Sequence, residues 1–240
     1  MAGERRRRIV AQLLRDAPEL ATSHLCAVCV ELTGMTGAGI MLMAGDLARG
    51  SVCTTDDISK VVEELQYALG EGPCVDAHNF GRPVLEPDLA EPSTPRWAAF
   101  TGPALDAGVR AIFGFPLRVG AVRLGALNLY CDRPGPLTAE QHADSLVAAD
   151  VATHAILALQ ANAPPGQLAV ELETGSNFRY VVHQATGMVA VQLDVSVGHA
   201  LIRLRAHAFG NERALEDVAH DVVARVLRFD ALSGEDDAAP

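Results

Sequence analysis

Hydrophobic and polar positions change their period several times along the first 160 residues, which predicts a mixed fold. Helical spacing is found over residues 5–33, with a bend near Pro18, and over residues 56–69, 97–108 and 138–160. Short apolar runs typical of strands lie at residues 38–43, 51–54, 83–86, 111–119 and 121–130. Because helices alternate with pairs of strands, we expect an α+β domain with an antiparallel sheet and flanking helices.

The end of the chain has a different pattern, in which three short amphipathic segments follow one another. They are NFRYVVHQATGMVAVQL, SVGHALIRLRAHAFG and ALEDVAHDVVARVLR, with short breaks between them. This pattern predicts an all-α bundle of three helices. In the second segment Ser196 is placed to cap the helix, with Leu201, Leu204 and Ala208 pointing inward.

Proline and glycine residues divide the chain between these two regions. The stretch ANAPPG at Ala161–Gly166 cannot continue the preceding helix, whose start is marked by Thr138 as N-cap. We therefore predict five parts: a basic helical extension over 1–19, the α+β domain over 20–160, a linker over 161–175, the bundle over 176–229 and an acidic tail over 230–240.

Composition indicates a globular protein of the cytoplasm. The chain has 240 residues with 49% hydrophobic content, and no apolar run approaches the ~18–20 residues of a membrane span. The four arginines near the start are not followed by the apolar core of a secretory signal. Cysteine occurs five times, and this odd number fits a reducing compartment better than a disulfide framework.

The charge is unevenly distributed. The net charge of −11 argues against nonspecific nucleic-acid binding by the whole molecule. Between Asn177 and Arg228, however, six arginines face five acidic residues, which leaves about +1. The bundle can therefore make a focused contact with phosphate groups, although its charge does not require one.

Two stretches resemble known families. The run LGEGPCVDAHNFGRPVLEPDLAEP, followed by GVRAIFGFPLRVGAVRLGALNLY, resembles a GAF domain of the type found in actinobacterial regulators. The later run QATGMVAVQLDVSVGHALIRLRAHAFGNERALEDVAHDVV resembles an ANTAR domain, an RNA-binding antiterminator module. The resemblance implies a homodimer that binds small-loop RNA hairpins so that transcription continues past a terminator. The GAF domain would supply the signal, by dimerising or by binding a small molecule.

The ANTAR resemblance implies RNA contacts on the first two helices of the bundle. Arg205 falls at the arginine of the family's L-R-x-x-A pattern, and Thr186 replaces the lysine of the usual Ala-Lys-Gly. Losing that lysine removes one phosphate contact. The expected RNA-binding residues are Gln184, Ala185, Thr186, Gly187, Arg203, Arg205 and His207.

The residues alone also allow a simpler interpretation of these positions. Arg203 and Arg205 fit an ordinary solvated helix face with ion pairs to Glu212 or Asp217. Gly187, inside a helix, indicates that another surface approaches closely. That surface is either RNA or a neighbouring helix.

Few other groups carry chemistry. Cys26 and Cys29 form a CxxC on an apolar helix without a second ligand pair, so we expect two small buried residues rather than a zinc site. Cys74 follows a turn and is a candidate redox-sensing thiol, provided that it is partly exposed. No metal or cofactor site is evident, and because catalytic motifs are absent we expect no enzymatic activity.

Two rival functions stay open. The chain fits a small-molecule-binding or protein-interaction module whose C-terminal bundle only dimerises. In the α+β domain, the apolar helix over 145–160 also suits a helical dimer seam. Three helices can also form a helix-turn-helix that binds DNA. The second segment of the bundle has little positive charge for that role.

Overall fold

The computed structural model describes residues 22–44, 47–161, 163–164, 169, 172 and 180–229. They form two compact units, one within residues 22–172 and one within residues 180–229. The predicted extension over 1–19, most of the linker over 161–175 and the tail over 230–240 lie outside the described residues.

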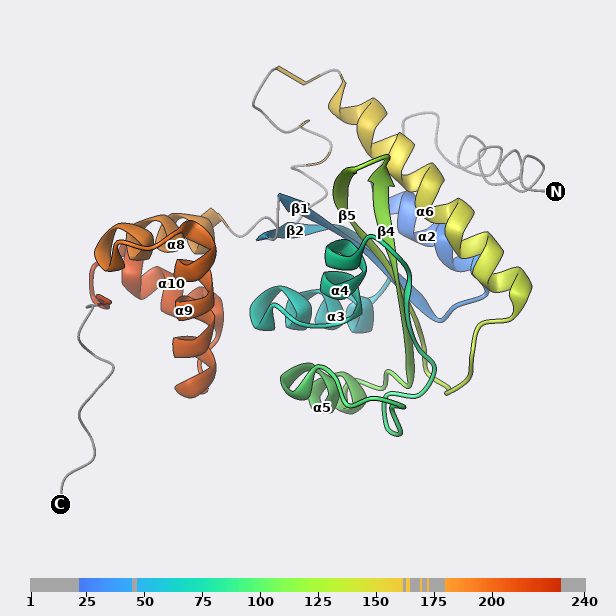
Figure 1. Cartoon of the computed structure of the whole chain (residues 1–240), viewed down its shortest axis with the longest axis horizontal. Helices are drawn as coiled ribbons and strands as arrows, with labels where there is room; N and C mark the ends of the chain where they lie inside the picture. The colour runs from blue at the N-terminus through green and yellow to red at the C-terminus, as the bar shows by residue number, and fades with distance from the viewer. Residues whose placement is uncertain are drawn as a thin grey trace. The chain divides into compact units, whose positions relative to one another are not determined.

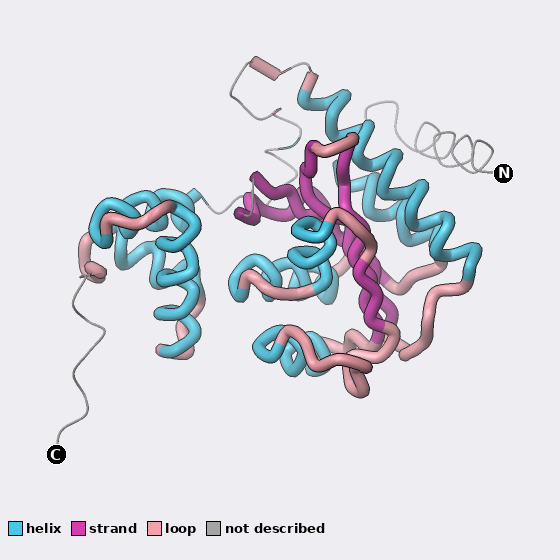
Figure 2. The backbone as a smooth tube through the Cα atoms, in the orientation of Figure 1, coloured by secondary structure: helices cyan, strands magenta, loops and turns pink. Residues whose placement is uncertain are grey.

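The larger unit is built on a five-stranded antiparallel sheet (Figures 1 and 2). Its strands are β1 (Gly37–Ala44), β2 (Leu47–Thr54), β3 (Val84–Glu86), β4 (Ala111–Val119) and β5 (Val122–Cys131). They lie in the order β2-β1-β5-β4-β3. The predicted α+β fold with an antiparallel sheet is confirmed.

Helices cover both faces of this sheet. They are α2 (Thr22–Thr33), α3 (Asp57–Leu69), α4 (Pro73–Phe80), α5 (Ala98–Asp106) and α6 (Ala139–Gln160). Helices α2 and α6 pack on one face, and α3 and α4 lie on the other (Figure 1). Helix α6 begins with a capping box, in which Gln141 N donates to Thr138 Oγ1 at 3.1 Å.

Helix α4 is an element that the hydrophobic pattern did not predict, since no helix was expected between residues 69 and 83. Pro73 lies in the first turn, where its fixed φ suits a helix and its missing N–H is no loss. Gly81 ends the helix in the left-handed conformation, with φ of 63°. Both signals were present in the sequence, eight residues apart.

The face of the sheet under α2 and α6 is an apolar core. Every second residue of β4 and β5 points into this core. These residues are Phe113 and Phe115 of β4 and Leu127 and Leu129 of β5, and each is at most 1% exposed. Alanines of α6 let that helix approach closely, and Ala148 and Ala152 are almost fully buried. The opposite face of β4 and β5 is buried too, which is why these strands appear in the sequence as continuous apolar runs.

One pair of cysteines corrects the expectation of free thiols. Cys26 of α2 and Cys53 of β2 form a disulfide across this core. They lie 27 residues apart, so the spacing of cysteines gave no sign of the pairing. Cys29, the other half of the CxxC, is buried as expected, and burial raises its pKa to about 12.

The smaller unit has the three predicted helices: α8 (Tyr180–Leu193), α9 (Val197–Gly210) and α10 (Leu215–Val223). Helix α9 begins at the expected cap, where His199 N donates to Ser196 Oγ at 3.3 Å. Leu201, Leu204 and Ala208 are buried, as predicted.

All three helices of this unit end in left-handed residues that are not glycine. These are Asp194, Glu212 and Arg225, with φ of 52°, 50° and 60°. After each, the backbone folds back: Val195 N donates to Ala190 O, Arg213 N to Ala208 O and Val226 N to Asp221 O. These are Schellman endings, in which glycine is the usual residue and a side chain costs roughly 1–2 kcal/mol.

In the described part of the chain, no single helix is both long and apolar enough to span a membrane. Taken together, α8 and α9 have the length and composition of a membrane span, but the two helices are bent by 105° at the break between them.

The packing of α4 on β4 predicts a cost for adding one methyl group. A Cβ at Gly114 would overlap the backbone carbonyl of Pro73, whereas one at Gly39 would meet the end of the Glu63 side chain, with 2.6 Å to Oε1. We expect Gly114→Ala to lower the free energy of unfolding by about 3 kcal/mol and Gly39→Ala by about 1 kcal/mol, because a backbone yields less than a side chain. Urea unfolding of the two variants checks the order, and equal costs would contradict it.

Candidate functional sites

A cluster of polar side chains is buried in the larger unit between α3, α4 and the sheet. Asn128 Nδ2 donates to Glu63 Oε1 at 2.5 Å, joining β5 to α3. Cys74 N, at the start of α4, donates to Gln66 Oε1 at 2.7 Å. Gly39 of β1 leaves the room in which the Glu63 carboxyl lies against the sheet. The exposed fraction of Glu63, Gln66, Cys74 and Asn128 is 2% or less.

This buried cluster leaves hydrogen-bonding atoms unused. Glu63 Oε2, Gln66 Nε2 and Asn128 Oδ1 have no hydrogen-bond partner among the described residues. Buried polar atoms are nearly always paired, so three orphans within one cluster indicate that something else meets them, such as water or a ligand. The cluster is therefore a candidate site for a small molecule.

Burial determines the protonation of the cluster. Loss of solvation raises the pKa of Glu63 to about 8, although hydrogen bonds from Asn128 and Ser51 oppose the shift. The carboxyl group is then mostly neutral at pH 7 and can donate a hydrogen bond.

Cys74 belongs to the same cluster, which corrects its assignment as a partly exposed redox thiol. The side chain is fully buried. Burial raises the pKa of the thiol well above its ordinary value, and the nearby Glu63 raises it further. Because the thiolate is the reactive form, this cysteine is poorly suited to sensing oxidants.

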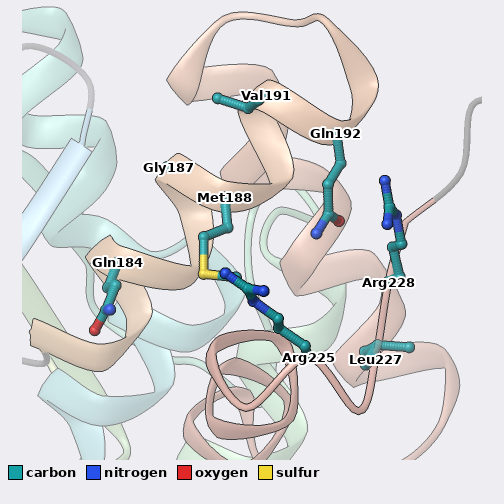
Figure 3. Close-up of a pocket in the computed structure, with 8 residues that line it drawn as sticks. All are labelled: Gln184, Gly187, Met188, Val191, Gln192, Arg225, Leu227 and Arg228. Atoms are coloured by element: carbon teal, nitrogen blue, oxygen red, sulfur yellow. The ribbon is translucent and has the colours of Figure 1, made fainter.

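The second candidate site is a groove of about 520 Å³ on the smaller unit (Figure 3). Helix α8 forms one wall and the segment after α10 forms the other. The lining residues are Gln184, Gly187, Met188, Val191, Gln192, Arg225, Leu227 and Arg228. The groove thus combines two guanidinium groups, two amides and apolar side chains.

The residues predicted on α8 fall on opposite sides of that helix. Gln184 and Gly187 are exposed and line the groove. Ala185 and Thr186 are buried, and Thr186 Oγ1 donates to Val182 O at 2.6 Å. Their side chains face the bundle core and cannot contact RNA, which corrects the prediction for both residues.

The predicted residues on α9 do not line the groove. Arg203 is exposed, Arg205 is half-buried, and they lie two positions apart on the helix. The ring of His207 packs edge-on against Phe229, with 5.3 Å between ring centroids, so this histidine helps to hold the chain after α10.

Sequence reasoning predicted Gln184 and Gly187 but missed the other residues of the groove, among them both of its arginines, Arg225 and Arg228. The sequence pattern gave these two arginines no role beyond their contribution to the charge of the bundle. Their place in the groove depends on where α10 ends and how the chain turns back, which the sequence marks with no glycine. Among the described residues, no group of three or more His, Cys, Asp or Glu side chains could hold a metal ion.

Comparison with known proteins places the larger unit in a family. A profile of the GAF domain family matches residues 15–164, more than half of the chain. The chain belongs to the GAF domain family. The match stops before the three-helix bundle, and no curated protein matches the chain. The resemblance of the bundle to ANTAR domains therefore stays a prediction.

Solved GAF domains have the same fold. One comes from a phosphoenolpyruvate-protein phosphotransferase of Coxiella burnetii, with 15% identity and a TM-score of 0.50 over 67% of this chain and 95% of that one. Another, from the Acinetobacter phosphoenolpyruvate-protein phosphotransferase, has 14% identity and a TM-score of 0.50 over 67% and 96%. At such identities the likeness shows the fold alone. GAF domains are signal-sensing and ligand-binding modules, and the buried cluster lies in this part of the chain.

The raised pKa of Glu63 predicts how stability changes with pH. In the unfolded chain the group ionises near its ordinary value of 4.5, and in the folded chain near 8. Between these values the folded state binds more protons, so the free energy of unfolding falls as pH rises and levels off above about pH 8. Glu63→Gln keeps the amide contact without ionising. We expect this variant to be more stable than the wild type at pH 8 and to lose part of the pH dependence.

Urea unfolding of both proteins from pH 5 to pH 9 measures this difference. Glu140→Gln, on the exposed first turn of α6, is the matched control and should leave the pH dependence nearly unchanged. Parallel curves for wild type and Glu63→Gln would show that Glu63 titrates normally.

Proposed function

We propose that this protein is a noncatalytic regulator whose GAF domain receives a signal and whose three-helix bundle binds RNA hairpins, so that transcription continues past a terminator. One observation carries the proposal: Gly187 lies open within a groove that also holds two arginines. A Cβ at this glycine would meet no described atom within 4 Å. No described helix of the bundle approaches Gly187, and this supports RNA as the surface that does.

The chemistry of the groove suits an unpaired stretch of RNA. Arginine pairs with phosphate and stacks on bases, and amide groups hydrogen-bond to base edges. Met188 and Val191 add apolar surface, and Val191 is 84% exposed. A solvated helix face explains single charges but not an open glycine and exposed apolar side chains beside them.

Arg203 gives independent support for a polyanionic partner. It is exposed, and within the described residues it forms no ion pair with Glu212 or Asp217. The simpler interpretation of α9 expected such pairs. Arg213, by contrast, does pair with an acid, with 2.7 Å from its Nη2 to Asp221 Oδ2.

Dimerisation belongs to the proposal because two linked bundles would bind tandem hairpins with raised effective concentration. Most apolar positions of α6 are used inside the GAF domain. Its exposed stripe consists of Leu146, Asp150, His154 and Leu157. This stripe is a narrower seam than the sequence predicted, so the homodimer stays a prediction that sedimentation of the full chain can test.

A second candidate function is a small-molecule-binding module in which the bundle serves only dimerisation. The orphaned atoms of Glu63, Gln66 and Asn128 favour a ligand in the GAF domain. The two functions are compatible, since a ligand could be the signal. A thermal-shift screen of metabolites alongside RNA binding separates them.

Gly187→Ala tests whether RNA approaches the open glycine. We expect the variant to raise the free energy of unfolding of the bundle by about 0.5–1 kcal/mol, because alanine is the better helix former. It should nevertheless weaken binding of tandem small-loop hairpins. Gly198→Ala on α9 is the matched control, since its Cβ also meets no close contact and it lies outside the groove. If Gly187→Ala bound the hairpins as tightly as Gly198→Ala, the surface beside Gly187 would not be the RNA site.

Arg203→Ala tests the contribution of α9. We expect weaker hairpin binding. The slope of the logarithm of the binding constant against the logarithm of salt concentration should become shallower by about one, as for the loss of one phosphate contact. Arg133→Ala in the GAF domain removes the same charge from a side chain that is 88% exposed and should change neither quantity. Filter binding at several salt concentrations measures both. Equal effects of the two variants would assign the change to overall charge.

A further inference from the structure

Arg225 occupies a backbone position where glycine is the usual residue. Its φ is 60°, and it follows the last turn of α10. Arg225 N donates to Val222 O at 3.0 Å, and Val226 N donates to Asp221 O at 2.8 Å. These two bonds form the complete Schellman ending, so the turn fixes the direction in which the arginine leaves the helix.

Among the described residues, no hydrogen bond or ion pair of the Arg225 side chain explains this position. The side chain is exposed. It lines the groove instead, and Figure 3 shows it extended toward Met188 of α8. Residues that oppose a local conformational preference without internal compensation are often kept for function.

The chain after Arg225 is held in place by contacts with α8 and α9. Gln192 Oε1 accepts a hydrogen bond from Phe229 N at 2.9 Å, which joins this segment to α8. The ring contact between Phe229 and His207 joins it to α9. Because Phe229 is fixed in this way, the preceding residue, Arg228, is held in place as well. Its side chain lies beside Gln192, away from Arg225 (Figure 3).

We infer that the groove between α8 and the segment after α10 binds a single strand of unpaired RNA, with Arg225 and Arg228 contacting its phosphates and Met188 and Val191 meeting its bases. The inference rests on the proposed function and adds the site and the form of the ligand. Apolar side chains require exposed base faces, which a loop presents and a stacked duplex does not. The two guanidinium groups that line the groove can each pair with a backbone phosphate.

The substitution Arg225→Gly separates binding from folding. Glycine fits the left-handed turn better than arginine, so the full-length variant should unfold at a higher temperature than the wild type. It should bind a fluorescent tandem-hairpin RNA about tenfold more weakly, since a charge-assisted contact is lost. The salt slope should fall by about one. A fully paired RNA of the same length should bind wild type weakly and lose little on substitution.

Glu212→Gly is the matched control because Glu212 has the same left-handed role at the end of α9 but lies outside the groove. It should also raise the unfolding temperature, without weakening RNA binding. Unchanged affinity and slope in Arg225→Gly would overturn the inference while leaving RNA binding by the bundle intact. Equal weakening in both variants would assign the effect to helix-end geometry and overturn it too. Failure of wild type to bind the hairpins at all would overturn the proposed function, and the inference with it.

Discussion

Strand β5 sends leucines to one face of the sheet and Ala126, Asn128 and Tyr130 to the other, and the architecture of the larger unit follows from this alternation. The leucine face is closed by α2 and α6, whose alanines and small residues let them pack tightly. On the other face Asn128 meets Glu63 of α3, and Tyr130 OH donates to Asp56 Oδ2 at 2.7 Å. One face of the sheet thus stabilises the fold, and the other collects polar groups.

Glycines make the polar face accessible to its helices. Gly114 lets the start of α4 lie against β4, and Gly39 makes room for the carboxyl group of Glu63. Larger residues at these positions would move α3 and α4 away from the sheet and open the cluster to water. The pKa of Glu63 would then return toward its ordinary value, because its shift comes mainly from burial. Packing and protonation in this unit are therefore linked.

The sequence was sufficient for most of the fold, because alternation and helical spacing mark elements that have one buried face. It did not indicate the disulfide, since Cys26 and Cys53 meet only through the packing of α2 on β2. The family resemblance placed four consecutive residues of α8 at the expected RNA site, although a helix that turns 100° per residue must direct some of them inward. Ala185 and Thr186 are those residues. A motif identifies positions, but the packed structure decides which side chains are exposed.

The groove shows a further limit of sequence analysis. A helix is expected to end at glycine, and by that rule nothing after α10 marks a turn. Arg225 stands at that turn in place of glycine, so the sequence does not mark the end of the helix. The same residue places a cation there, which glycine could not. The two candidate sites therefore favour different partners. A neutral, buried carboxyl group suits an uncharged ligand, since burying a charge there would be costly. The exposed guanidinium groups of the groove suit a polyanion, because their planar, permanently charged forks match the geometry of phosphate. Under the proposed function this difference matters, because a signal molecule that also fitted the groove would compete with RNA.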